Sequence, residues 1–115
     1  MLTKNPEREC PETTGTFSFD ETSSSEQTVV TITITSRKRI GGFHFDMSNV
    51  TQDTTIKIKH QIDGTNYRTL QTIKWGSGGD DGVYVEGFKA YRNVRVTFTC
   101  GGGGAGSVNV PYAIV

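Results

Sequence analysis

This sequence of 115 residues contains no long apolar run, and only 33% of its residues are hydrophobic. A membrane-spanning helix needs about 18 to 20 consecutive apolar residues, so we expect no membrane partner. The first stretch, MLTKNPERECPETT, also lacks the apolar segment of a secretory signal. We therefore expect synthesis in a cytoplasm, and the alternative is a signal that was removed from a precursor.

The sequence also has no excess of charge of either sign. Twelve Lys plus Arg residues balance twelve Asp plus Glu residues, which gives a formal net charge of zero. A neutral chain has no global field to draw it toward nucleic acid or acidic lipid, although local patches remain open. We therefore predict that nucleic acid is not a partner.

The spacings that mark metal and catalytic sites are absent as well. The sequence has no HxH, CxxC or HExxH motif, and Cys10 and Cys100 are 90 positions apart. We expect His44 and His60 at outward strand positions, without a nucleophile in an elbow-like glycine context. These absences predict a protein that is not an enzyme and binds no cofactor. Two reduced thiols are expected, with a Cys10–Cys100 disulfide as the alternative.

What the sequence does contain is a series of short runs in which apolar and polar residues alternate. The clearest are QTVVTITITS at 27–36, FHFDM at 43–47 and NVRVTFTC at 93–100. Alternation with a period of two is typical of strands that have one buried face. About eight such runs and no helical segment predict an all-β fold, a single antiparallel β-sandwich that is jelly-roll-like or immunoglobulin-like. We assign residues 15–115 to this domain and residues 1–14 to an extended N-terminal arm.

The segment KIKHQIDGTNYRTL, residues 57–70, predicts a hairpin. An Asp-Gly pair between two strand patterns favours a two-residue type I′ turn, because both central residues need positive φ. We therefore place the turn at Asp63 and Gly64. The alternation puts Ile58 and Ile62 toward the core and Lys57, Lys59 and His60 on the solvated face or its rim.

Two glycine-rich segments, GSGGDDG at 76–82 and GGGGAG at 101–106, are predicted as loops. The first has two carboxylates, too few for an EF-hand-like calcium site, and a solvated hinge is the preferred interpretation. The second lacks the Lys-Ser/Thr ending of a phosphate-binding loop. Loops of sandwiches often carry partner contacts. Our candidate contacts to a partner or a glycan are Trp75, Asp80, Asp81 and Tyr84.

The central block FDMSNVTQDTTIKIKHQIDGTNYRTL resembles small tailed-phage and related bacterial proteins of uncharacterised function. The matching pieces are DMS at 46–48, TQ at 51–52, IDGTNYR at 62–68 and, weakly, VPY at 110–112. The resemblance covers residues 43–75 and implies a virion-associated β-sandwich, such as a capsid decoration protein or a head or tail accessory subunit.

From this resemblance we expect a phage structural protein that binds capsid or tail proteins of its own virion. It would form a homo-oligomer and be located in the virion after synthesis in the host cytoplasm. The alternative from the residues is a carbohydrate-binding module for host-surface attachment, which would bind a host glycan through Trp75, Tyr84 and Asp80 or Asp81.

Overall fold

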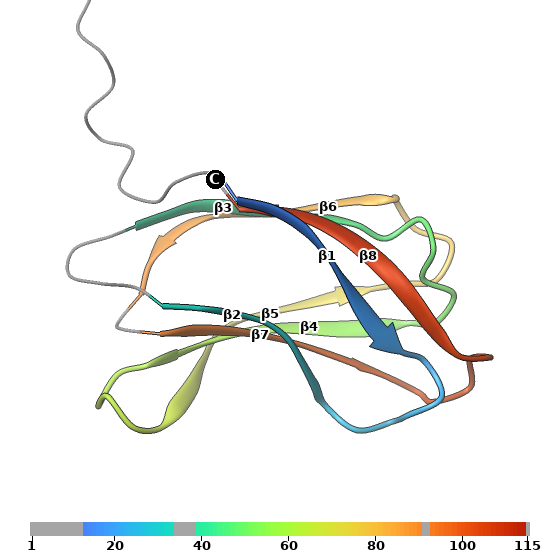
Figure 1. The fold of residues 1–115 in the computed structure, drawn as a ribbon, viewed down its shortest axis with the longest axis horizontal. Coiled ribbons are helices and arrows are strands. Elements are labelled where there is room, and N and C mark those ends of the chain that lie inside the picture. Colours follow the sequence, from blue (N-terminus) through green and yellow to red (C-terminus); the bar gives the residue numbers. More distant parts are fainter. Residues whose placement is uncertain (1–12, 34–38, 91–92, 115) are drawn as a thin grey trace, which may run out of the picture.

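The computed structural model describes residues 13–33, 39–90 and 93–114, which form eight strands and no helix. The strands are β1 (Thr13–Asp20), β2 (Gln27–Ile32), β3 (Arg39–Asp46), β4 (Thr54–Gln61), β5 (Tyr67–Trp75), β6 (Gly82–Lys89), β7 (Val94–Cys100) and β8 (Ser107–Ile114). They form two antiparallel sheets, and the two layers face each other (Figure 1). The first sheet has the order β1-β8-β3-β6 and the second sheet has the order β2-β7-β4-β5. The predicted eight-stranded, jelly-roll-like sandwich is confirmed.

The core lies between the sheets and is organised around the ring of Phe98 on β7. Its centroid is 5.0 Å from that of Phe17, 5.3 Å from that of Phe19 and 5.6 Å from that of Phe45. These three rings belong to the first sheet, and all three meet Phe98 edge to face, the arrangement that the charge distribution of aromatic rings favours. One side chain therefore ties the second sheet to two strands of the first.

The alternation in the sequence correctly identifies most inward positions. Phe43, Phe45 and Met47 are 0%, 2% and 0% exposed, and the predicted inward residues of β7 are buried too: Val94, Val96, Phe98 and Cys100. Period-two burial against one core is enough to account for these elements.

Two assignments around the β4–β5 hairpin are wrong. His60, expected on the solvated face, is only 8% exposed, and Ile62, expected in the core, is 55% exposed. His60 lies two residues beyond Ile58 and therefore shares its inward face. The alternation of apolar and polar residues continues to Ile62 in the sequence, but β4 ends at Gln61. Ile62 therefore belongs to the turn, where the opposite sheet does not cover it.

The hairpin itself is confirmed, but its two-residue type I′ turn is wrong. Gln61 is opposite Tyr67, which leaves a connection of five residues, and Gly64 has a φ of 79°. The carboxylate of Asp63 accepts hydrogen bonds from the backbone N–H groups of Thr65 and Asn66. Asp63 therefore stabilises the turn as a side-chain acceptor in an Asx-type arrangement.

The GGGGAG loop is held by Glu21, which is only 1% exposed. Gly104 donates its N–H to the backbone carbonyl of Glu21, and Glu21 donates its own N–H to the carbonyl of Gly106. The buried carboxylate accepts bonds from Thr51, through its backbone N–H and its hydroxyl, and from the N–H of Gln52. Three loops at one end of the sandwich are thus joined at Glu21, and this glycine-rich loop has a structural role.

Residues 1–12, with most of the predicted N-terminal arm and Cys10, lie outside the described residues, so the arm and the state of Cys10 stay predictions. Thr13 and Thr14 of the predicted arm belong to β1 and pair with β8. Cys100 is buried as a free thiol. None of the described segments is a helix long and apolar enough to cross a membrane.

Candidate functional site

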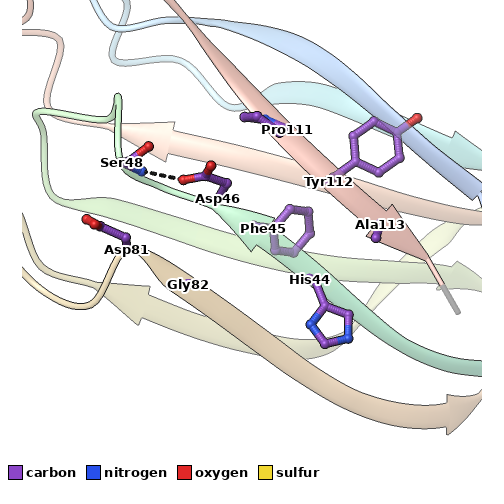
Figure 2. A pocket seen from close by; sticks show the side chains of 9 residues that line it. All are labelled: His44, Phe45, Asp46, Ser48, Asp81, Gly82, Pro111, Tyr112 and Ala113. Atoms are coloured by element: carbon purple, nitrogen blue, oxygen red, sulfur yellow. Dashed lines mark hydrogen bonds between the residues drawn. The ribbon is translucent and has the colours of Figure 1, made fainter.

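A shallow depression of about 620 Å³ lies on the outer side of the first sheet, between β3 and β8 (Figure 2). It reaches the start of β6 and the loop that precedes it. Its lining residues are His44, Phe45, Asp46, Ser48, Asp81, Gly82, Pro111, Tyr112 and Ala113. We call this surface, together with the adjacent Tyr84, the β3–β8 face.

The depression forms where β3 and β8 stop pairing. β8 pairs with β1 along its full length, but it pairs with β3 only from Tyr112 to Ile114. The next residue toward the start of β8 is Pro111, which has no N–H to donate to a neighbouring strand. Beyond Pro111, toward the start of β8, the side-chain amide of Asn49 in the β3–β4 loop donates a hydrogen bond to the carbonyl of Asn109 on β8. Pro111 therefore sits where the ladder ends and the surface becomes hollow.

An aromatic pair is exposed beside this depression. His44 on β3 is opposite Tyr84 on β6, and their ring centroids are 4.6 Å apart. Tyr84 is 53% exposed and its hydroxyl lies 3.4 Å from the carbonyl oxygen of Gly41, to which it donates. A Cβ on Gly42 would lie 2.6 Å from the Tyr84 ring, so the lack of a side chain at Gly42 lets this ring lie across β3.

Two carboxylates, those of Asp46 and Asp81, lie at the end of the β3–β8 face that is opposite the aromatic pair. Asp46 accepts a hydrogen bond from the backbone N–H of Ser48, and bonding by the side chain and then the backbone of Ser48 holds the pKa of Asp46 below its usual value. The carbonyl of Asp81 accepts a bond of 2.6 Å from the N–H of Met47, which fixes the β5–β6 loop next to β3. The face therefore combines exposed rings with negative charge at its rim.

The four predicted contact residues do not all lie together. Asp81 lines the depression and Tyr84 stacks on its His44, whereas Trp75 is only 8% exposed and donates its indole N–H to the carbonyl of Asp80. Trp75 therefore supports the loop and offers little surface to a ligand. The role of these four residues in binding stays a prediction.

Sequence reasoning missed His44 and Pro111 as parts of the site. His44 was correctly placed at an outward position. However, its pairing with Tyr84 depends on β3 and β6 being neighbours, although 40 residues separate the two positions in the sequence. A proline inside a strand pattern is a signal for interrupted pairing, and Pro111 could have been found that way.

The two histidines do not converge. His44 is exposed on the first sheet, whereas His60 is buried on the second. Within residues 13–33, 39–90 and 93–114, no group of three or more His, Cys, Asp and Glu side chains could hold a metal ion. Asp53 does approach the GSGGDDG loop, where it accepts a hydrogen bond of 2.7 Å from the N–H of Ser77. Asp53 thus fixes this loop as part of the fold.

Comparison with known proteins gives one informative result. No protein-family model matches the sequence, and no curated protein does. The structure is similar to that of the Yersinia pseudotuberculosis-derived mitogen (YPM), with a TM-score of 0.53 and 11% sequence identity. The match covers 91% of this chain and 86% of the mitogen. At this identity the likeness shows a shared fold.

This match overturns the resemblance to phage virion proteins and the function inferred from it. The solved structure that shares this fold is a mitogen and not a virion protein, so the prediction of a capsid decoration or head or tail accessory subunit is wrong. The alternative of a carbohydrate-binding attachment module is not retained either. The motif IDGTNYR that carried the resemblance is explained by the Asp63 turn, and such turn chemistry recurs in unrelated hairpins. The expectations about partners, oligomeric state and location are not tested and stay predictions.

Proposed function

We propose that this protein is a non-catalytic effector that acts by binding a protein on the surface of another cell, as expected of a mitogen. The observation that carries this proposal is the exposed His44–Tyr84 pair beside the depression of the β3–β8 face. Protein interfaces are commonly built from aromatic side chains at the centre and polar groups at the rim. The fold likeness to the Yersinia mitogen supports the same class of action.

The composition of the face fits a protein partner. Tyr84 presents a rigid ring at little entropic cost, and its neighbour His44 limits its movement. Asp46 and Asp81 supply a negative rim that would select a partner with positive charge at the matching positions. Because the depression is shallow and open, it suits an inserted side chain of a partner better than an enclosed small molecule.

The test is a cell-proliferation assay with the purified protein. We expect DNA synthesis in cultured mammalian lymphocytes to rise with protein concentration, and we expect the double variant H44A/Y84A to need roughly 30-fold more protein, the effect of losing one interface hot spot. Thr28→Ala, on an exposed position of β2 in the other sheet, is the control and should act like the wild type.

Two results would oppose the proposal. The first is no stimulation at any concentration by protein whose circular dichroism shows it to be folded. The second is full stimulation by H44A/Y84A, which would move the activity away from the β3–β8 face. Thermal melts of both variants should match the wild type, because the two side chains pack mainly against each other on the surface.

A further inference from the structure

Besides Arg39 on β3 and Lys89 on β6, five Lys and Arg residues lie on strands of the second sheet. They are Lys57 and Lys59 on β4, Arg68 and Lys74 on β5, and Arg95 on β7. The described acidic side chains on strands of the first sheet are Asp20, Asp46 and Glu86. The strands of the second sheet contain no Asp or Glu residue, so the positive charge of these five residues is not balanced within the strands of that sheet.

Four of these cations share the outer face of the second sheet. Lys57 and Lys59 alternate with the buried Ile56 and Ile58, so they point away from the core. Lys59 is opposite Arg95, and the remaining outward cation, Lys74, is next to the inward Trp75. We call the surface formed by Lys57, Lys59, Lys74 and Arg95 the basic face.

The protein itself neutralises little of this charge. Glu26 lies 2.7 Å from the ammonium of Lys59, and this contact, helped by a hydrogen bond from Thr97, lowers the pKa of Glu26. Among the described side chains, no carboxylate forms an ion pair with the other three cations of the basic face. The positive charges of these neighbouring side chains repel each other. An anion that binds to the basic face would reduce this repulsion.

Arg95 packs on an aromatic ring. Its guanidinium lies 3.8 Å from the centroid of the Tyr67 ring, which fixes its plane. Its Nε–H is buried and has no hydrogen-bond acceptor in the described part of the chain. Because Nε is buried, an external carboxylate cannot reach it, and Arg95 contributes to the basic face through its positive charge.

The basic face also borders an unpaired strand edge. β5 is the terminal strand of the second sheet, and its residues from Arg68 to Thr72 are all exposed. A bulge interrupts its pairing with β4 at Leu70, which is 37% exposed, but the register is regular from Gln71 to Trp75. An exposed edge offers backbone N–H and C=O groups that another extended chain can use.

We propose that an acidic, extended segment of a partner protein adds to β5 as a fifth strand of the second sheet. Its alternate carboxylates would face Lys74 on the adjacent strand and Lys57 one strand farther. Strands lie about 4.8 Å apart, so both ammonium groups are within reach of glutamate side chains. This proposal is independent of the one for the β3–β8 face, because it concerns the opposite sheet.

A polypeptide fits these observations better than a nucleic acid. Only a polypeptide can continue the hydrogen-bond ladder of β5. A single-stranded nucleic acid would need free rings on which bases stack, and the ring of Tyr67 is covered by Arg95. The flat sheet offers no protruding helix or ribbon for the groove of a duplex.

The probe is a fluorescein-labelled ten-residue peptide of alternating threonine and glutamate, whose binding is followed by fluorescence anisotropy at low salt. We expect saturable binding, and we expect none with the threonine–glutamine analogue. The variant K57Q/K74Q should bind about tenfold more weakly, as the loss of two exposed charge contacts predicts. The matched variant K57R/K74R should bind like the wild type because it keeps both charges.

A second peptide tests the strand addition itself. The same threonine–glutamate sequence with N-methyl groups on alternate residues keeps its charges but cannot pair along an edge, so it should not bind. Equal binding of both peptides would overturn the proposal, as would the absence of binding by either. Binding of duplex DNA or of a sulfated polysaccharide in place of the peptide, weakened by K57Q/K74Q, would assign the basic face to another polyanion and would also overturn it.

Discussion

At the scale of single residues, Asp63 defines the β4–β5 turn through its side chain. Its carboxylate accepts bonds of 2.7 Å from the N–H of Asn66 and 2.9 Å from the N–H of Thr65, and a third bond comes from the side-chain amide of Asn66. These bonds stabilise the ionised form and lower the pKa of Asp63 from 3.8 to about 2, the backbone N–H of Asn66 having the largest effect.

The first prediction concerns this pKa. Because the folded value lies below the ordinary one, the contribution of Asp63 to stability is complete above pH 3.8 and is lost as the pH falls toward 2. A titration of the carboxyl carbon of Asp63 by NMR should give the low value. Asn66→Ala should raise this pKa but leave it below 3.8, since both backbone bonds remain. An ordinary pKa in the wild type would contradict the turn geometry.

Among the structural elements, the loops and strand ends shape the molecule as much as the strands do. Pro111 ends the β3–β8 pairing and opens the depression, and Glu21 joins the β1–β2, β3–β4 and β7–β8 loops. In both cases a local feature of one segment decides the geometry of a distant one. The contact between Glu21 and the β7–β8 loop also depends on Gly104, because a Cβ at this position would collide with the Cβ of Glu21.

The second prediction follows from that collision. Gly104→Ala should lower the free energy of unfolding by about 1 to 3 kcal/mol, the usual cost of overpacking a closed site. The measurement is urea denaturation followed by circular dichroism. Gly101→Ala, in the same loop but with nothing within 4 Å of the added Cβ, is the control and should be near neutral. If both variants were equally stable, Glu21 would not be the point that joins the loops.

In the molecule as a whole, one aromatic cluster holds the two sheets together. The ring of Phe98 contacts the first sheet at Phe17, Phe19 and Phe45. A core that is shared in this way couples the two layers, so the sandwich should unfold as one unit. The first sheet carries the exposed His44–Tyr84 pair and the second sheet carries the basic face, so the molecule offers two different surfaces to partners.

The third prediction tests this coupling. Phe98→Ala should lower the free energy of unfolding by about 3 to 5 kcal/mol, whereas Phe88→Ala, at a half-buried position of β6, should cost less. Unfolding of the wild type should have the same midpoint by far-ultraviolet circular dichroism and by fluorescence of Trp75, which is the only tryptophan. Separate midpoints would show that the sheets unfold independently.

The positions of the strands can be predicted from the sequence, because burial on one face of a strand is a local pattern with a period of two. Phe43, Phe45 and Met47 were assigned correctly for that reason, and Ile62 was not, because the alternation continues past the end of β4. The IDGTNYR motif likewise reported local turn chemistry, and for this reason it was a poor guide to kinship.

Contacts between residues that are distant in the sequence depend on the order of the strands in the folded chain. His44 stacks on Tyr84, Glu21 bonds to Thr51, and Lys59 lies opposite Arg95 because strands or loops distant in sequence became neighbours. A neutral composition likewise gave no sign that Lys57, Lys59, Lys74 and Arg95 share the outer face of the second sheet. Each strand pattern is compatible with many strand orders, and the packing of both sheets around Phe98 favours one of them, so both surfaces emerge only in the folded chain.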